Sequence, residues 1–340
     1  MEFNTKLTLF RTFSIHGLLT LLRQRPIQYL IGGWLLLNTL LLVLGANGMP
    51  VSLVEGDGTA HVFLFLSTGL AYLLQLALVY AITTRREGPD FTIKTPDRKT
   101  AVQETVYLWI YALIMLIVLG GGFGIGLHLP GTIFDPNMVL NSNSIIVWAG
   151  VNFTIFAAIP YLIFRRRGYT HDDMLLRSRN WWADLLLIAV VLIIESLIEW
   201  FGIPDGMRFF ALTPTQMGLG GLLNLFLHLL GTGLPILIFV QAILVPRYYK
   251  ISGSLAGAVV AGGITYATFH LFEFWTVYQS LETTAVSLVF VYLQFTGAGM
   301  IKAMMTLRSG NAWTHLWGYH LIAPHLWTDT NIFVQAFRIR

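Results

Sequence analysis

The chain has 340 residues, of which 55% are apolar and only 11% are charged. A soluble globular domain carries roughly one quarter charged residues, so this composition predicts an integral membrane protein. The absence of cysteine excludes disulfides and thiolate sites, and leaves any metal to His, Asp and Glu. The net charge of +4 comes mostly from Lys and Arg in short loops beside apolar runs. This placement favours topology and anionic lipid headgroups over nucleic acid as its cause.

Residues 1–26 place three arginines around apolar positions and predict an amphipathic helix lying on the membrane surface. The apolar run that follows is longer than the roughly 7–15 residues of a signal-peptide core, so we expect an uncleaved first span. The runs near membrane-spanning length are 27–47, 60–83, 103–127, 143–165, 181–202, 217–246, 255–277, 285–307 and, less strongly, 310–327. The predicted fold class is therefore all-α: a polytopic transmembrane helical bundle of eight spans plus a short or ninth C-terminal helix.

The basic residues are concentrated in two loops. Segments 84–101 and 165–179 hold ten of the 21 Lys and Arg residues, whereas 51–60 and 129–144 hold none. The positive-inside rule predicts that the basic loops and the N-terminus are cytoplasmic. Without repeats or long linkers, we expect one unit, organised as an interfacial segment (1–26), N-terminal transmembrane helices (27–158), a transmembrane core (159–327) and a tail (328–340).

Several ionisable side chains fall deep inside the predicted spans. His270 lies roughly 22 Å from the start of its span and Glu195 roughly 21 Å from the start of its own, past the midplane of a core about 30 Å thick. Glu273 follows His270 by three residues and Glu199 follows Glu195 by four, so each pair shares a helix face. Such groups must face one another, water, a metal or a partner, or stay protonated. The alternative is structural: Glu199 and Glu273 reach the headgroups, and the histidine is a neutral hydrogen-bonded ring.

Two further histidines, His228 and His320, lie roughly 16 Å and 15 Å into their helices. His320 belongs to a set with His315 and His325 that recurs every five residues. Five residues of α-helix rotate the chain by about 500°, so neighbouring members should not share a face. We therefore expect at most one or two of them to point into one site.

Two stretches resemble motifs of the CAAX-protease and bacteriocin-processing (CPBP) family of intramembrane proteins. "YATFH" (266–270) is similar to that family's F-x-x-x-H motif, with Tyr266 in place of Phe. "LRSGNAWTHLWGYH" (307–320) is similar to its third motif, which ends in a histidine, here His320. The resemblance covers approximately 160–326 and implies a CPBP-like core over 159–327.

The motif that supplies the catalytic glutamates of this family, E-E-x-x-x-R, is missing. Pro235 and Ile236 stand where the glutamates should be, Val240 stands where the arginine should be, and Pro324 replaces the Asn or Asp four residues after the last histidine. In this family a glutamate is understood to activate water, which neither Pro nor Ile can do. The resemblance thus implies the fold of the family without its peptidase mechanism.

Three functions follow as hypotheses. The first is a non-catalytic membrane scaffold, acting in assembly, immunity or regulation, with the lipid bilayer and another membrane protein as partners. The second is an active intramembrane endopeptidase, in which Glu195 or Glu199 works with His270 and His320 as a displaced base.

The third hypothesis is a cofactor-binding membrane subunit. In one version, haem or a chlorophyll-type pigment is bound by His270 and His320, with His228 as a further candidate. In the other, a divalent metal is bound by His270, Glu273 and His320. The sequence alone leaves open whether any cofactor is present.

Overall fold

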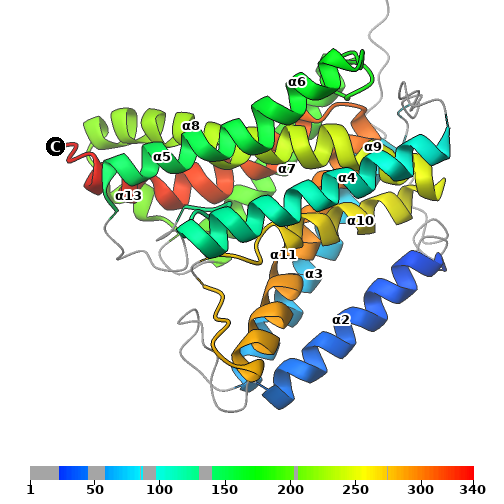
Figure 1. Ribbon diagram of the computed structural model, residues 1–340. Helices are drawn as coiled ribbons and strands as arrows, with labels where there is room; N and C mark the ends of the chain where they lie inside the picture. Colours follow the sequence, from blue (N-terminus) through cyan, green and yellow to red (C-terminus); the bar gives the residue numbers. More distant parts are fainter. Residues whose placement is uncertain are drawn as a thin grey trace, which may run out of the picture.

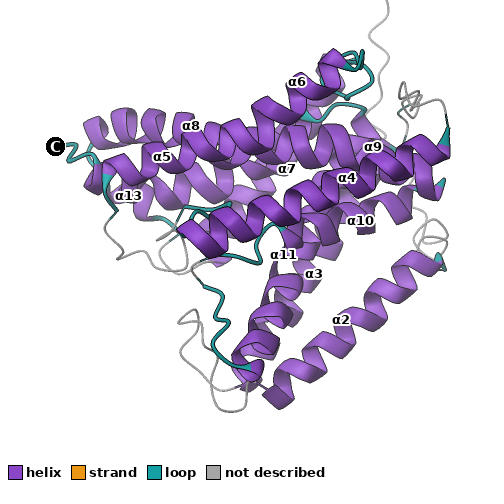
Figure 2. Ribbon diagram, viewed as in Figure 1, coloured by secondary structure: helices purple, strands orange, loops and turns teal. Residues whose placement is uncertain are grey.

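The computed structural model describes residues 23–44, 58–84, 86, 97–129, 140–202, 206–273 and 275–340. These residues form helices joined by loops, with no strand among them (Figures 1 and 2). The interfacial helix predicted over 1–26 falls almost wholly outside the described residues. The predicted all-α class is confirmed.

Seven of the described helices are long and apolar enough to cross a membrane, which supports an integral membrane protein. Four are α2 (Arg25–Leu44), α3 (Gly58–Thr83), α7 (Trp181–Gly202) and α11 (Leu281–Ser309). The other three combine α-helix with π-helical turns: Arg98–Gly122, which contains α4 (Arg98–Leu116); Ser142–Arg166, which contains α5 (Ser142–Asn152) and α6 (Ile159–Arg166); and Gln216–Ser252, which contains α8 (Gly221–His228) and α9 (Val245–Ser252).

The span predicted over 255–277 is shorter than expected. Its helix, α10 (Leu255–Thr268), has 14 residues. After Thr268 the chain continues in tight turns, in which the His270 amide donates to the Ala267 carbonyl at 2.9 Å and the Leu271 amide donates to the Thr268 carbonyl at 3.2 Å. These turns carry His270 and Glu273 into the protein interior, where both are buried. The predicted end of this span, residue 277, was wrong because the α-helix ends at Thr268 and the chain continues in turns.

The C-terminal segment is built from α12 (Trp313–His315), π-helical turns over Leu316–His320 and Ile322–Trp327, and α13 (Thr328–Ala336). The Leu321 amide donates to the Leu316 carbonyl, five residues back, at 2.9 Å. A π-helix bonds residue i to i+5, so side chains five residues apart come close to one face. The ring centroids of His315 and His320 lie 6.1 Å apart, and those of His320 and His325 lie 5.6 Å apart. The expectation that they would not share a face was wrong because it assumed α-helical rotation.

Small residues allow α10 and α11 to pack closely. A Cβ atom added to Gly299 would lie 2.9 Å from the Cα atom of Gly263 and 2.5 Å from the Cβ atom of Tyr266. The contact therefore requires glycine at 299. It also places Lys302 of α11 beside Tyr266 of α10, with the Lys302 Nζ atom 3.5 Å from the centroid of the tyrosine ring.

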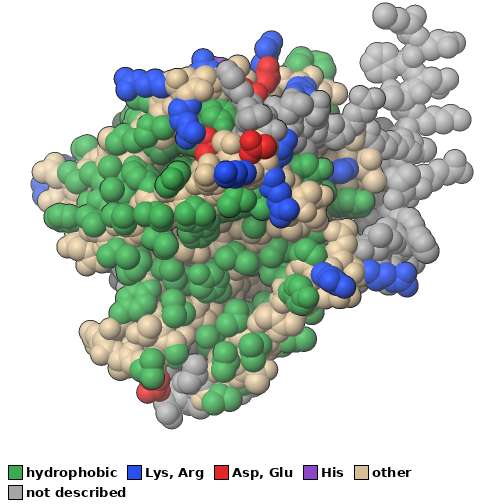
Figure 3. Space-filling view, turned by 45° about the vertical axis from the view of Figure 1, so that its right-hand side comes forward, with side chains coloured by type: hydrophobic (Ala, Val, Ile, Leu, Met, Phe, Trp, Pro, Cys, Tyr) green, Lys and Arg blue, Asp and Glu red, His purple; other side chains and the backbone are tan. Residues whose placement is uncertain are grey.

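Hydrophobic side chains cover the middle of the face seen in Figure 3, and most of its charged side chains lie toward the upper edge. Near the loops predicted to be cytoplasmic, Arg86 pairs with Asp184 at 2.7 Å. Exposed leucines and valines follow the long helices, α2 included. This distribution suits a surface that contacts lipid, and the orientation of the termini stays a prediction.

A candidate metal centre of buried histidines

Six histidines from four separate parts of the chain meet inside the helical bundle. Each has 8% or less of its surface exposed. The ring centroids of neighbouring pairs lie between 4.3 and 6.1 Å apart. One follows the π-helical end of the α4 span, one ends α8, one follows α10, and three come from the C-terminal segment: His128, His228, His270, His315, His320 and His325. We call His128, His228, His270, His320 and His325 the histidine cluster, and His315 lies beside it.

Two carboxylates complete potential ligand sets within the histidine cluster. Three groups bring one ligand atom from each member within 4.8 Å of the others, and every member is buried. They are His128, His270 and Glu273; His228, His325 and Asp329; and His128, His320 and His325. Imidazole nitrogens and carboxylate oxygens are the ligands that zinc, iron and manganese take in the absence of thiolates.

The hydrogen bonds around His228 fix which of its nitrogens is available to a metal. Its Nδ1 atom donates to the Oδ1 atom of Asn224 at 2.5 Å. The Asn224 amide is itself oriented, because its Nδ2 atom donates to the His325 carbonyl at 2.8 Å. Oδ1 can only accept, so Nδ1 carries the proton and Nε2 carries the lone pair. That Nε2 atom is buried and has no hydrogen-bond partner.

His270 repeats this arrangement. Its Nδ1 atom donates to the Tyr266 carbonyl at 2.7 Å, and its buried Nε2 atom is left without a partner. In His325 the Nδ1 atom lies 2.9 Å from the Asp329 carboxylate of the same ligand group, so Nδ1, and not the Nε2 atom on the other side of the ring, is the atom that can share an ion with Asp329. A metal-bound histidine typically donates its other ring N–H to a carbonyl or carboxylate, which fixes the ring and exposes the lone pair to the metal. His228 and His270 show this pattern.

Two pairs of side-chain atoms lie at distances that suit two ligands of one metal ion better than a direct hydrogen bond. The His128 Nδ1 atom lies 3.6 Å from Oε1 of Glu273, and the His228 Nε2 atom lies 3.4 Å from Oδ2 of Asp329. Both exceed the usual hydrogen-bond length. Two ligand atoms bound at about 2.0–2.1 Å to one tetrahedral ion lie about 3.3–3.4 Å apart. An ion between each pair would therefore require only small shifts.

A tight loop after the α4 span positions His128. The Gly126 carbonyl accepts hydrogen bonds from Nδ2 of Asn152 at 2.9 Å and from Nε1 of Trp148 at 3.2 Å. The His128 amide donates to Oε1 of Glu273 at 3.0 Å. Gly126 allows this approach, because a Cβ atom there would lie 2.1 Å from Oε2 of Glu273.

We expect the substitution Gly126→Ala to destabilise the protein by about 1–3 kcal/mol, because the added methyl group overlaps a buried, hydrogen-bonded carboxylate. Thermal unfolding in detergent measures the effect. Gly122→Ala is the matched control, since a Cβ atom there has nothing within 4 Å and alanine suits a helix better than glycine. Equal unfolding temperatures for the two variants would contradict the close approach of Glu273.

Burial also affects the ionisation of His128 and Asp329, two residues of the ligand groups that lie outside the membrane-spanning segments. It lowers the pKa of His128 well below its usual value, and the neighbouring histidines add to this effect. His128 is therefore neutral and keeps a lone pair for a metal. Burial raises the pKa of Asp329 to about 7, so a nearby cation would favour its ionised form.

Glu195 and Glu199, predicted as displaced bases, belong to none of the three groups. The Gln75 Nε2 atom donates to Oε2 of Glu195 at 2.5 Å, and the charge of Glu195 also acts on Lys302. Glu199 is buried, its Oε2 atom has no hydrogen-bond partner, and its carboxyl group lies close enough to those of Glu195 and Asp329 to interact with them electrostatically. The two glutamates therefore border the histidine cluster without completing a ligand set.

The structure places the other predicted site residues in different groups. His270 and Glu273, predicted to bind metal with His320, lie together with His128 instead, and His320 falls in the group of His128 and His325. His228 joins His325 and Asp329. Sequence analysis missed His128 and Asp329.

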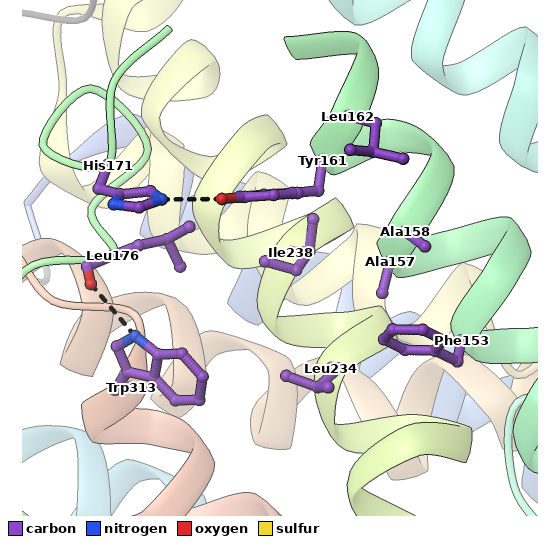
Figure 4. A pocket seen from close by; sticks show the side chains of 10 residues that line it. All are labelled: Phe153, Ala157, Ala158, Tyr161, Leu162, His171, Leu176, Leu234, Ile238 and Trp313. Carbon is purple, nitrogen blue, oxygen red and sulfur yellow. Dashed lines mark hydrogen bonds between the residues drawn. The ribbon is translucent and has the colours of Figure 1, made fainter. Parts of the chain in front are cut away.

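A separate cavity of about 410 Å³ lies beside the basic loop at 165–179 (Figure 4). Its lining is mainly apolar, with His171 bonded to the Tyr161 hydroxyl at 2.8 Å and the Trp313 indole donating to the Leu176 carbonyl at 3.2 Å. No member of the histidine cluster lines this cavity. The cavity and the cluster are thus distinct features.

Comparison of the chain with protein-family models, with curated proteins and with solved structures finds no match. The function is therefore inferred from the residues and their geometry. Pro235, Ile236 and Val240, which occupy the positions of the missing glutamates and arginine in the CPBP resemblance, are buried.

Proposed function

We propose that this protein is an integral membrane metalloprotein that holds a transition metal ion in the histidine cluster. The observation that carries the proposal is that every histidine of the cluster has one buried ring nitrogen without a hydrogen-bond partner: Nδ1 of His128 and His320, and Nε2 of His228, His270 and His325. Nε2 of His315, beside the cluster, also lacks a partner. A buried polar atom without a partner costs free energy, and a metal ion would satisfy several of these atoms at once.

The surrounding charges favour a cation. Four buried carboxylates lie in or beside the cluster, those of Glu195, Glu199, Glu273 and Asp329, and the one buried ammonium described near them is that of Lys302. Uncompensated carboxylates inside a membrane protein are costly. A divalent ion would reduce this excess of negative charge.

The ion would also join parts of the chain that lie far apart in sequence. Each ligand group draws on two of these parts: the loop after the α4 span with the turn after α10, the end of α8 with the C-terminal segment, or the loop after the α4 span with the C-terminal segment. Such cross-linking would support the scaffold function expected from the sequence, because a rigid interior presents fixed helix faces to a membrane partner.

A metal-dependent intramembrane peptidase is the second candidate. The two histidines of the CPBP resemblance flank one tyrosine, with ring centroids 4.5 Å from Tyr266 to His270 and 5.8 Å from Tyr266 to His320. Glu273 would then provide the carboxylate that the missing motif does not. Burial of both histidines gives this candidate less support, because a peptide needs access to the reacting atoms.

Metal analysis of the purified protein tests the proposal. The full chain would carry a purification tag without histidine, and its metal content would be measured by mass spectrometry after exposure to Zn²⁺, Fe²⁺, Mn²⁺ or Co²⁺. We expect at least one tightly bound ion per chain. The double variant with His128→Ala and His325→Ala should lose it, because every ligand group contains one of these residues.

His315→Ala is the matched control, since His315 is fully buried beside the cluster but belongs to none of the three groups. It should retain the metal. A wild-type protein that binds none of the four ions would contradict the proposal.

A further inference from the structure

Two of the three ligand groups share no residue. One consists of His128, His270 and Glu273, and the other consists of His228, His325 and Asp329. Each therefore offers two histidines and one carboxylate. This ligand set is used by non-haem iron and by zinc sites that keep an open coordination position.

The third group connects the other two. It takes His128 from one and His325 from the other, and adds His320. A neutral imidazole has one lone pair, so an ion bound by the third group would deprive both of the others of a histidine. The two groups that share no residue can each bind an ion at the same time. Together they use four of the five histidines of the cluster and the carboxylates of Glu273 and Asp329.

The charges of the region are compatible with two bound ions. The carboxylates in and beside the cluster outnumber the ammonium groups described there by three. One divalent ion would reduce this excess from three negative charges to one, and two divalent ions would leave one positive charge, so the charge count accommodates either one ion or two. Each group contains one pair of ligand atoms at a spacing that suits a shared ion: His128 and Glu273 at 3.6 Å, and His228 and Asp329 at 3.4 Å.

We propose that the histidine cluster is a two-metal centre, with one divalent ion bound by His128, His270 and Glu273 and a second bound by His228, His325 and Asp329. This inference rests on the proposed metal-binding function. His320 lies between the two sites, with its ring centroid 5.6 Å from that of His325 and its Nδ1 atom without a partner. It is the residue placed to complete either coordination shell or to hold a small oxygen ligand between the ions.

The stoichiometry of metal binding tests this inference. Metal-depleted, full-length protein would be titrated with Co²⁺, whose visible absorption reports coordination, and the bound metal would be counted after removal of excess ion. The wild type is expected to saturate at two ions per chain. Glu273→Gln and Asp329→Asn should each lose one ion, and the double variant should lose both.

The outcomes separate the two proposals. Saturation of the wild type at one ion would overturn the two-metal centre and leave the metalloprotein function standing. Binding of no ion would overturn both. Loss of both ions from either single variant would contradict the assignment of separate sites.

Two controls keep the variants interpretable. His315→Ala should bind two ions, as the wild type does. Each variant should also elute as a monodisperse species with wild-type helicity, and the wild-type titration alone decides the stoichiometry if a variant fails to fold.

Discussion

Removal of metal is expected to lower the stability of the wild-type protein by about 3 kcal/mol, measured against protein held at a free metal concentration roughly one hundred times the dissociation constant. The ion binds the folded state through residues that are far apart in the unfolded chain, so its binding free energy adds to that of folding. Thermal unfolding of the purified protein, with and without the chelator phenanthroline, measures the shift.

The double variant with His128→Ala and His325→Ala is the comparison for this shift. It lacks a ligand of every group, so its unfolding temperature should be insensitive to the chelator. His315→Ala should respond as the wild type does. An equal chelator effect on the wild type and on the double variant would show that the chelator acts elsewhere.

Replacement of Glu104 by alanine is expected to cost about 3–5 kcal/mol of unfolding free energy, because it leaves a buried guanidinium without its counter-charge. Glu104 is 3% exposed and Arg247 is 1% exposed. The Arg247 Nε atom donates to Oε2 of Glu104 at 2.9 Å, and Arg167 and the Tyr169 hydroxyl contact the same carboxylate at 2.9 Å. This network joins the start of α4 to α9.

Two variants test the origin of this loss. Glu282→Ala removes an exposed carboxylate from the first turn of α11 and should cost at most about 1 kcal/mol. Combining Glu104→Leu with Arg247→Met removes both charges and should be less harmful than Glu104→Ala, because no buried charge is left alone. Denaturant unfolding of the detergent-solubilised protein compares all three, and equal losses for Glu104→Ala and Glu282→Ala would contradict the buried network.

The spans could be predicted because a transmembrane helix requires an unbroken apolar run of about 20 residues, which is visible in the sequence. The span predicted over 181–202 matches α7, and the span over 285–307 falls inside α11. The depth of an ionisable residue in a span also follows from its position in the apolar run. It identified His228, His270, Glu273 and His320 as candidates, and the structure buries all four.

The partners of these residues could not be predicted, because depth does not give the direction of a side chain or the neighbouring helix. His128 lies in a loop just after an apolar run, where a histidine has no periodic pattern to mark it. Asp329 fell in the segment interpreted as a tail, yet it is fully buried. The short α10 was missed because apolar residues on both sides of His270 hid the end of the helix.

The π-helical turns of the C-terminal segment determine which sequence changes the histidine cluster can accommodate. A π-turn contains one residue more than an α-turn, so deletion of a single residue between His320 and His325, in the π-helical turns of Ile322–Trp327, would convert them to α-helix and leave the helices on either side in place. His320 and His325 would then stand four positions apart while keeping their neighbours in space. A distant relative with the same centre can therefore carry these two histidines four positions apart instead of five.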